Sequence, residues 1–267
     1  MSKKYLVVFG LFLAASFLFL SNVPSAKAET WVWDGGGDGQ TWTDSKNWDK
    51  NNGLGPSSND YPGATSTADV VITANLASRT IYATSTLNYG IGSLTLGATN
   101  VGWTLMIGGA SFGASSTMSI VGTSTLQLAT TTYGSGTLNL GQTAAGTPLS
   151  LVSTATFTAA TGTVAYVSGG TANIIVATTT FYNLQLTPTS TAAVRTYKFG
   201  AFAVDQKSQA ATTTVSNVFT INDAAKADFQ GMADLLLSGS GTVFSKANGD
   251  FMQTSKVVYS STSATNI

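Results

Sequence analysis

Short pairs of apolar residues, each split by one mostly polar residue, recur through the middle of this chain. Side chains in a β-strand alternate between two faces, so each pair predicts a short strand with one apolar face. The first members of successive pairs are separated by only 11, 13, 8, 12 and 11 residues, which leaves no room for a helix between strands. The pairs are Leu94/Leu96, Leu105/Ile107, Met118/Ile120, Leu126/Leu128, Leu138/Leu140 and Leu149/Leu151. The pattern therefore predicts an all-β fold.

Two all-β architectures accept many short strands at this spacing. A β-sandwich, or a pair of them, joins its strands by antiparallel hairpins, whose tight turns favour Asn-Gly or Asp-Gly. The connectors here are instead rich in Gly, Ala, Ser and Thr, as in residues 108–111 and 122–124. They favour a right-handed parallel β-helix. This is a solenoid with coils of about 20–25 residues, in which similar residues of successive coils lie above one another. We predict this solenoid, with roughly ten coils, and keep the β-sandwich as the alternative.

The first 28 residues have the organisation of a secretory signal peptide. Lys3 and Lys4 precede an apolar segment, residues 5–20, and Ala26-Lys27-Ala28 matches a small-residue cleavage site. We expect the mature chain to begin at Glu29, to be secreted or displayed at the cell surface, and to contain no membrane span. Within it we predict a cap rich in Trp, Gly and Asp over residues 29–62, a solenoid repeat region over 63–258 and a polar C-terminal tail over 259–267.

The chain contains neither cysteine nor histidine, and its charges are unevenly distributed. No acidic residue lies between Asp69 and Asp205, and the bases in that interval are Arg79, Arg195 and Lys198. The commonest general base is thus missing, and the predicted solenoid faces lack the paired carboxylates that glycoside hydrolysis requires. The mildly acidic mature chain also lacks the basic patch of a nucleic-acid-binding protein. We expect no enzyme activity, no cofactor and no nucleic-acid partner.

Four of the five tryptophans lie in the predicted cap: Trp31, Trp33, Trp42 and Trp48. In one interpretation these indoles cover the open end of the core, because a solenoid needs an atypical terminal unit. In the other, exposed ring faces stack on sugars, which makes the four residues candidate glycan-binding residues. The nearby glycines with Asp34 and Asp38 resemble a calcium-binding turn. A single imperfect copy indicates a plain glycine turn, so we predict no metal site.

Two stretches resemble known repeat proteins. The run Trp31-x-Trp-Asp-Gly-Gly-Gly-Asp-Gly, followed by Trp42, Asn47-Trp48 and Asp69-Val-Val-Ile72, resembles the opening module of large secreted bacterial proteins of the parallel β-helix type. Residues 157–166 and 180–186 are similar to a repeat of the same adhesin-like or autotransporter-passenger-like surface proteins. The resemblance implies an extracellular or cell-surface location and supplies no catalytic residue.

These observations lead to one expected function and one alternative. We expect an extracellular or cell-surface structural or adhesive repeat protein without catalytic activity. Surface glycans or other extracellular matrix components would be its partners. The alternative is a secreted carbohydrate-binding or carbohydrate-active protein that works through the N-terminal tryptophan segment.

Overall fold

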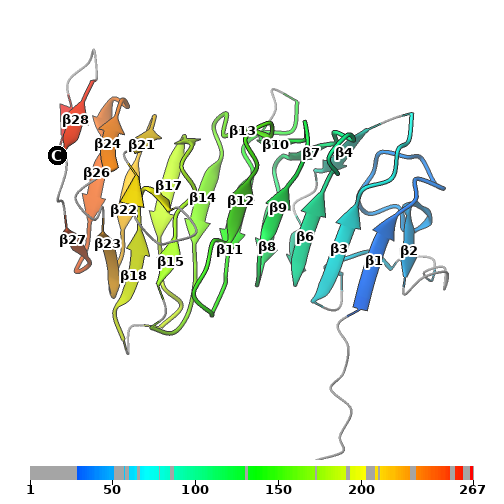
Figure 1. Ribbon diagram of the computed structural model, residues 1–267, viewed down its shortest axis with the longest axis horizontal. Coiled ribbons are helices and arrows are strands. Elements are labelled where there is room, and N and C mark those ends of the chain that lie inside the picture. Colours follow the sequence, from blue (N-terminus) through cyan, green and yellow to red (C-terminus); the bar gives the residue numbers. More distant parts are fainter. Residues whose placement is uncertain are drawn as a thin grey trace, which may run out of the picture.

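The computed structural model describes most of the chain after residue 28. The described residues are 29–50, 57, 60–64, 67–77, 79–84, 87–129, 132–171, 173–190, 193–202, 208–209, 211–228, 233–252, 256–260 and 265–266. The signal peptide predicted for residues 1–28 lies outside them. The described chain is an elongated parallel β-solenoid of about seven turns, with its strands stacked side by side along the long axis (Figure 1). The predicted solenoid is confirmed, and the β-sandwich alternative is not what the structure shows.

Three sheets form the sides of the N-terminal and central coils. The first sheet contains, in spatial order, β12 (Leu149–Leu151), β9 (Met118–Ile120), β6 (Ser93–Leu96), β3 (Ala68–Ile72), β1 (Glu29–Trp33) and β2 (Trp48–Lys50). The second contains β13 (Thr156–Thr158), β10 (Thr125–Leu128), β7 (Thr104–Ile107) and β4 (Thr80–Ala83). The third contains β26 (Phe244–Lys246), β22 (Phe219–Ile221), β17 (Asn183–Leu186), β14 (Thr163–Tyr166), β11 (Thr137–Leu140), β8 (Ser111–Ala114) and β5 (Asn88–Ile91).

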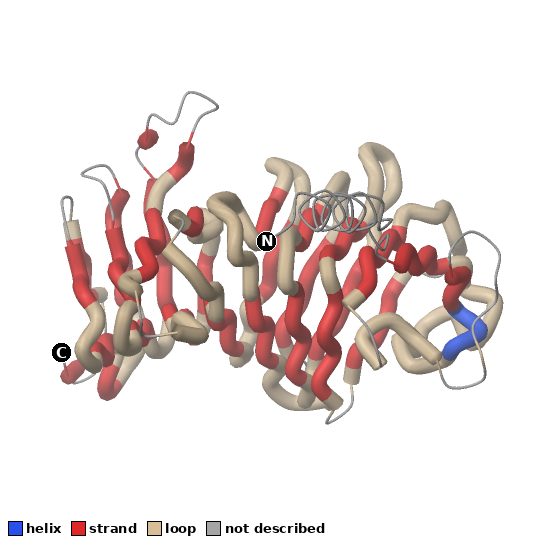
Figure 2. The backbone as a smooth tube through the Cα atoms, turned by 90° about the horizontal axis from the view of Figure 1, so that it is seen from below, coloured by secondary structure: helices blue, strands red, loops and turns tan. Residues whose placement is uncertain are grey.

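Two further parallel sheets take over the sides of the C-terminal coils. Strands continue along the long axis as far as the C-terminal end (Figure 2). One contains β15 (Ile174–Ile175), β18 (Arg195–Lys198), β23 (Ala225–Asp228) and β27 (Asp250–Met252). The other contains β16 (Thr180–Phe181), β21 (Ala211–Val215), β24 (Ala233–Leu237) and β28 (Val257–Tyr259). Short pairs are formed by β19 (Ala201–Phe202) with β20 (Ser208–Gln209) and by β25 (Gly241–Thr242) with β29 (Thr265–Asn266), and one 3₁₀ turn, η1, spans Ser45–Asn47.

The strands stack in a register that keeps apolar residues in inward columns. On the first sheet, Leu94 pairs with Val70 on one side and with Met118 on the other, and all three are buried. Each fully buried aliphatic side chain of this kind contributes about 1.5–3 kcal/mol. Because successive coils share these columns, the interior is one continuous hydrophobic core that no single coil could form alone.

The coils are less regular than the roughly 20–25 residues expected from sequence, and some are considerably longer. Side chains that meet between adjacent coils are separated by 20 residues for Asn183 and Thr163, 24 for Ser93 and Asp69, and 35 for Asn222 and Thr187. The chain therefore makes about seven turns, and the expected ten are wrong. The physical reason is that long connectors lengthen some of the coils, as between Thr187 and Asn222.

The segments predicted as cap and as polar tail both contribute strands at the ends of the solenoid. Strand β1, in the predicted cap, pairs in parallel with β3 and is therefore part of the first coil, while antiparallel β2 covers its outer edge. At the other end, residues 265–266 of the predicted polar tail form β29 and pair with β25. The described part of the chain contains no helix that is long and apolar enough to cross a membrane.

Candidate functional site

The four tryptophans predicted as candidate glycan-binding residues lie inside the cap. Trp31 and Trp48 are 1% exposed, and Trp33 and Trp42 are 0% exposed. Trp48 is central, because its ring lies edge-on to Trp33 and to Trp42 with centroid distances of 4.8 Å, and to Trp31 at 6.5 Å. Trp103, outside the cap segment, joins them at 6.3 Å from Trp33. The indoles thus form one aromatic cluster at the N-terminal end of the core.

This placement argues against the glycan-binding role considered for Trp31, Trp33, Trp42 and Trp48. Stacking on a sugar needs a ring face open to solvent, and these faces pack on one another. The cause lies in the strand register, since Trp31 pairs with Val70 at the head of an inward column. Their burial fits the interpretation in which the indoles cover the end of the core. Lys50 closes the outer side, with its Nζ 5.0 Å from the Trp31 ring and 3.2 Å from the carboxylates of Glu29 and Asp60.

The aspartates of the glycine-rich turn bind backbone amides. Oδ1 of Asp38 accepts hydrogen bonds from the amides of Gln40 at 2.8 Å and Thr41 at 2.7 Å, and from Nδ2 of Asn47 at 2.8 Å. Burial alone raises the pKa of Asp38, but these hydrogen bonds outweigh it and hold the pKa well below its ordinary value. Oδ1 of Asp34 accepts from the Gly36 amide at 2.9 Å. Across the described residues, no three His, Cys, Asp or Glu side chains gather as a metal site would require.

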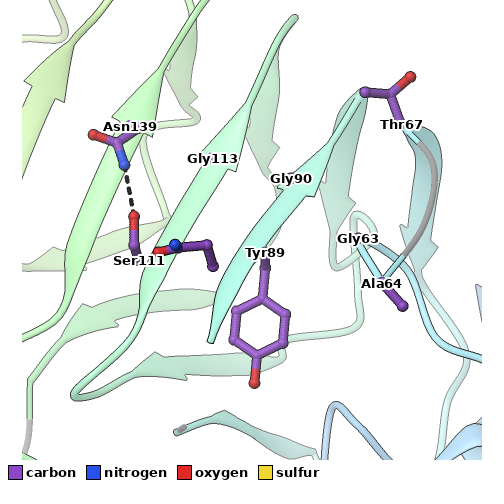
Figure 3. A pocket seen from close by; sticks show the side chains of 9 residues that line it. Gly63, Ala64, Thr67, Tyr89, Gly90, Ser111, Gly113 and Asn139 are labelled. Carbon is purple, nitrogen blue, oxygen red and sulfur yellow. Dashed lines mark hydrogen bonds between the residues drawn. The ribbon is translucent and has the colours of Figure 1, made fainter. Parts of the chain in front are cut away.

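A hollow of about 640 Å³ opens on the outer face of the third sheet, at its N-terminal edge (Figure 3). We call it the glycine groove. Its lining residues are Gly63, Ala64, Thr67, Asn88, Tyr89, Gly90, Ser111, Gly113 and Asn139. They come from the turn before β3 and from the three adjacent strands β5, β8 and β11. The groove therefore spans several coils.

Two glycines in register create the floor of this groove. Gly90 of β5 pairs with Gly113 of β8, which pairs with Asn139 of β11, and the three occupy one outward column. A Cβ atom added at Gly90 would have no other atom within 4 Å, so the space above it is open. On the other side, the turn at Gly63 closes the sheet edge, because a Cβ there would lie 3.0 Å from the backbone nitrogen of Gly90. Gly63 has a φ of +87°, a conformation that favours glycine.

The groove is polar and uncharged. Nδ2 of Asn139 donates a hydrogen bond of 2.8 Å to Oγ of Ser111 across two strands, and Asn88 is exposed at the edge of the same face. None of the nine lining residues carries a charge. Amide and hydroxyl groups of this kind bind ligands by hydrogen bonds. The arrangement is suited to binding.

The groove is not among the sites predicted from the sequence, although the sequence carries one signal for it. Glycine weakens the interior of a strand and often marks a place where another molecule approaches closely. Gly90 and Gly113 occupy such interior positions, each flanked by inward-facing apolar residues. Comparisons of the chain with protein-family models, with curated proteins and with solved structures found no match.

Proposed function

We propose that this protein is an extracellular or cell-surface structural repeat protein with an adhesive role, which acts by binding and carries out no catalysis. The observation that carries the proposal is the glycine groove, an uncharged hollow on the outer face of a stacked, rigid sheet. Export rests on the signal-peptide pattern of residues 1–28 and on the resemblance to secreted repeat proteins.

The ligand that suits the groove best is a neutral glycan. Saccharide hydroxyls both donate and accept hydrogen bonds, as do the amides of Asn88 and Asn139 and the hydroxyl of Ser111. A charged polymer would gain no ion pair from this lining. We therefore propose that the glycan is bound by hydrogen bonds in the groove and not by stacking on the tryptophans, whose rings are buried.

An extended chain also matches the surface that continues from the groove. From β5 to β17, one outward column of the third sheet presents an amide or hydroxyl group on each strand: Asn88, Ser111, Thr137, Thr163 and Asn183. Neighbouring strands lie about 4.8 Å apart, so the column is a regular ladder of polar groups. A polymer lying along the solenoid axis can contact several of them at once, which suits adhesion through many weak bonds.

The test is a binding measurement with neutral polysaccharides on the mature chain, by glycan array and then by calorimetry. Gly90→Val places a branched side chain in the open floor of the groove, in a strand where valine is well tolerated. We expect it to fold and to lose binding. Loss of the Ser111 hydroxyl in Ser111→Ala should weaken binding about threefold to tenfold, the value of one hydrogen bond.

The matched control is Gln185→Val, which changes the same outward column away from the groove. Gln185 pairs with Ala165, which pairs with Asn139, so the control lies two strands beyond the groove lining. It should retain binding to the groove. The proposal is wrong if no neutral polysaccharide binds, or if folded Gly90→Val binds as tightly as Gln185→Val.

A further inference from the structure

Two tyrosines from different coils meet on the outer face of the second sheet. The ring centroids of Tyr82 and Tyr133 lie 5.9 Å apart, and the ring planes are tilted by 53°. Tyr82 belongs to β4, whereas Tyr133 lies in the turn that follows β10, and β7 is the strand between β4 and β10 in the sheet. The contact therefore joins two coils that are not neighbours in the stack.

The main chain holds Tyr82 in an outward position. Its neighbours Ile81 and Ala83 are both 0% exposed, so the alternation of the strand directs the Tyr82 side chain away from the core. The amide of Tyr82 donates a hydrogen bond of 2.8 Å to the carbonyl of Gln40, and its carbonyl accepts one of 3.1 Å from the amide of Trp42. Tyr82 is thus fixed where the cap meets the second sheet.

Two glycines allow Tyr133 to lie close to this face. Gly108 and Gly109 belong to the connection that follows β7. A Cβ atom at Gly108 would lie 2.7 Å from Cβ of Tyr133, and one at Gly109 would lie 2.8 Å from the carbonyl oxygen of Tyr133. A larger residue at either position would push the Tyr133 turn away from the preceding coil. The Tyr133 side chain itself remains 43% exposed.

Exposure distinguishes this contact from the other tyrosine contacts of similar spacing in the described chain. The tyrosine pairs with centroids 5.9–6.2 Å apart are Tyr82/Tyr133, Tyr61/Tyr89 and Tyr166/Tyr197. Tyr89 is 2% exposed, and Tyr166 and Tyr197 are 0% exposed. Tyr82 is partly exposed and Tyr133 is largely so. A reagent in solution can therefore reach both members of the Tyr82/Tyr133 pair, which is not true of the other two pairs.

Adjacent accessible phenols can be coupled by oxidation. A haem peroxidase uses hydrogen peroxide to remove one electron and one proton from each of two phenols, and the peroxide is reduced to two water molecules. The two phenoxyl radicals then form a C–C bond between the ring carbons next to the oxygens. The hydrogen atoms on those carbons move to the oxygens, which restores both phenols and leaves dityrosine as the product.

We propose that Tyr82 and Tyr133 are the site of an oxidative cross-link, formed as dityrosine by a haem peroxidase and hydrogen peroxide. The rings must come closer than 5.9 Å before the bond forms, and the exposed Tyr133 side chain can do so by rotating about its side-chain bonds. The chain contains no cysteine, so no disulfide links its coils. The dityrosine bond closes a loop that includes β7 and β10, and it restricts the unfolded chain as a disulfide would. This site is separate from the glycine groove and does not depend on the proposed function.

The test is treatment of the purified mature chain, at low protein concentration, with a peroxidase and hydrogen peroxide. Proteolysis and mass spectrometry then identify the products. We expect a linked pair of peptides that contain residues 82 and 133, with a mass lower by two hydrogen atoms than the sum of the two peptides. Dityrosine fluorescence should appear in a chain that stays monomeric. Oxidation of methionine adds oxygen instead and is recognised by its mass.

Conservative variants keep the test independent of folding. Tyr82→Phe and Tyr133→Phe retain the packed ring and remove the phenolic O–H from which the radical forms. Each should abolish the linked peptides. Tyr259→Phe is the matched control, because Tyr259 is 42% exposed, and it should leave the link unchanged.

Three results would overturn the proposal. The first is an absence of dityrosine, which would reduce the contact between Tyr82 and Tyr133 to surface packing. The second is dityrosine formed only between two copies of the chain. The third is a link within the chain that persists in Tyr82→Phe or Tyr133→Phe.

Discussion

The indole nitrogen of Trp48 donates a hydrogen bond of 2.8 Å to the backbone carbonyl of Trp42, at the centre of the aromatic cluster. The bond is buried, and it ties β2 to the loop that leads into η1. By contrast, the indole nitrogens of Trp31 and Trp33 are buried without a partner. The four indoles of the cluster thus differ in whether the ring nitrogen donates a hydrogen bond, and the effect of this difference on stability can be measured.

The contrast predicts unequal effects of the same substitution. Trp48→Phe leaves the Trp42 carbonyl buried without its donor, whereas Trp33→Phe removes a donor that had no partner. The two variants lose the same ring volume from equally buried positions, so cavity costs largely cancel in the comparison. We expect Trp48→Phe to lower the free energy of unfolding by about 1–3 kcal/mol more than Trp33→Phe does. Equal losses in urea unfolding would show that the Trp48 hydrogen bond contributes nothing net.

The inward columns predict a sharp difference between neighbouring residues on β11. Leu138 is 0% exposed and pairs with Phe112 and Val164, whereas Asn139 faces outward. Leu138→Asp buries a carboxylate without a partner and should cost more than about 4 kcal/mol, because several coils share the column. Asn139→Asp, the control, loses the donor of the hydrogen bond to Ser111 and should cost about 1 kcal/mol or less. Circular dichroism and urea unfolding check this, and a Leu138→Asp variant that unfolds like Asn139→Asp would contradict the inward assignment.

The strands that are easiest to predict from the sequence are those that contain aliphatic pairs. Leu105/Ile107 and Leu126/Leu128 have the period-two pattern of a half-buried strand, and both pairs are buried in adjacent strands of the second sheet. Phe112-Gly113-Ala114 fills an equivalent place in the third sheet but escaped the pattern. Its outward residue is glycine and its second inward residue is small, so the apolar contrast between the faces is weak.

The sites were harder to predict from the sequence than the fold, because they depend on which coils come to lie together. The glycine groove needs Gly90 and Gly113 to be in register, and that register follows from connectors whose length varies from coil to coil. The burial of Arg195 likewise depends on the turn at Gln142, whose carbonyl accepts a hydrogen bond from it across 53 residues of sequence. Tryptophan composition predicted a cap, but the inward position of its rings follows from the parallel pairing of Trp31 with Val70 and from their burial.

The contacts of the glycine-rich turn predict that chelation has no effect on stability. The carboxylates of Asp34 and Asp38 accept backbone amides of the same turn, so the turn holds its shape through hydrogen bonds. We expect the melting temperature of the mature chain to be the same in EDTA and in millimolar calcium. A calcium-dependent rise that disappears in Asp38→Ala would contradict this and would restore the calcium interpretation of the turn.

The depressed pKa of Asp38 predicts how stability changes in acid. The folded state favours the carboxylate through the hydrogen bonds from Gln40, Thr41 and Asn47, so its contribution is present above the unfolded pKa of about 3.9 and is lost as the pH falls further toward the lower folded pKa. Asp38 is exposed, and solvent screening limits the contribution to about 1 kcal/mol or less. We therefore expect Asp38→Asn, which keeps an acceptor oxygen but not the charge, to be less stable than the wild type at pH 7, with a difference that narrows as the pH falls below about 4. Asp38→Ala, which loses the acceptor, should be less stable than Asp38→Asn across this range. Urea unfolding across this range measures both differences, and a gap between the wild type and Asp38→Asn that does not change with pH would show that the Asp38 charge has no role in holding the turn.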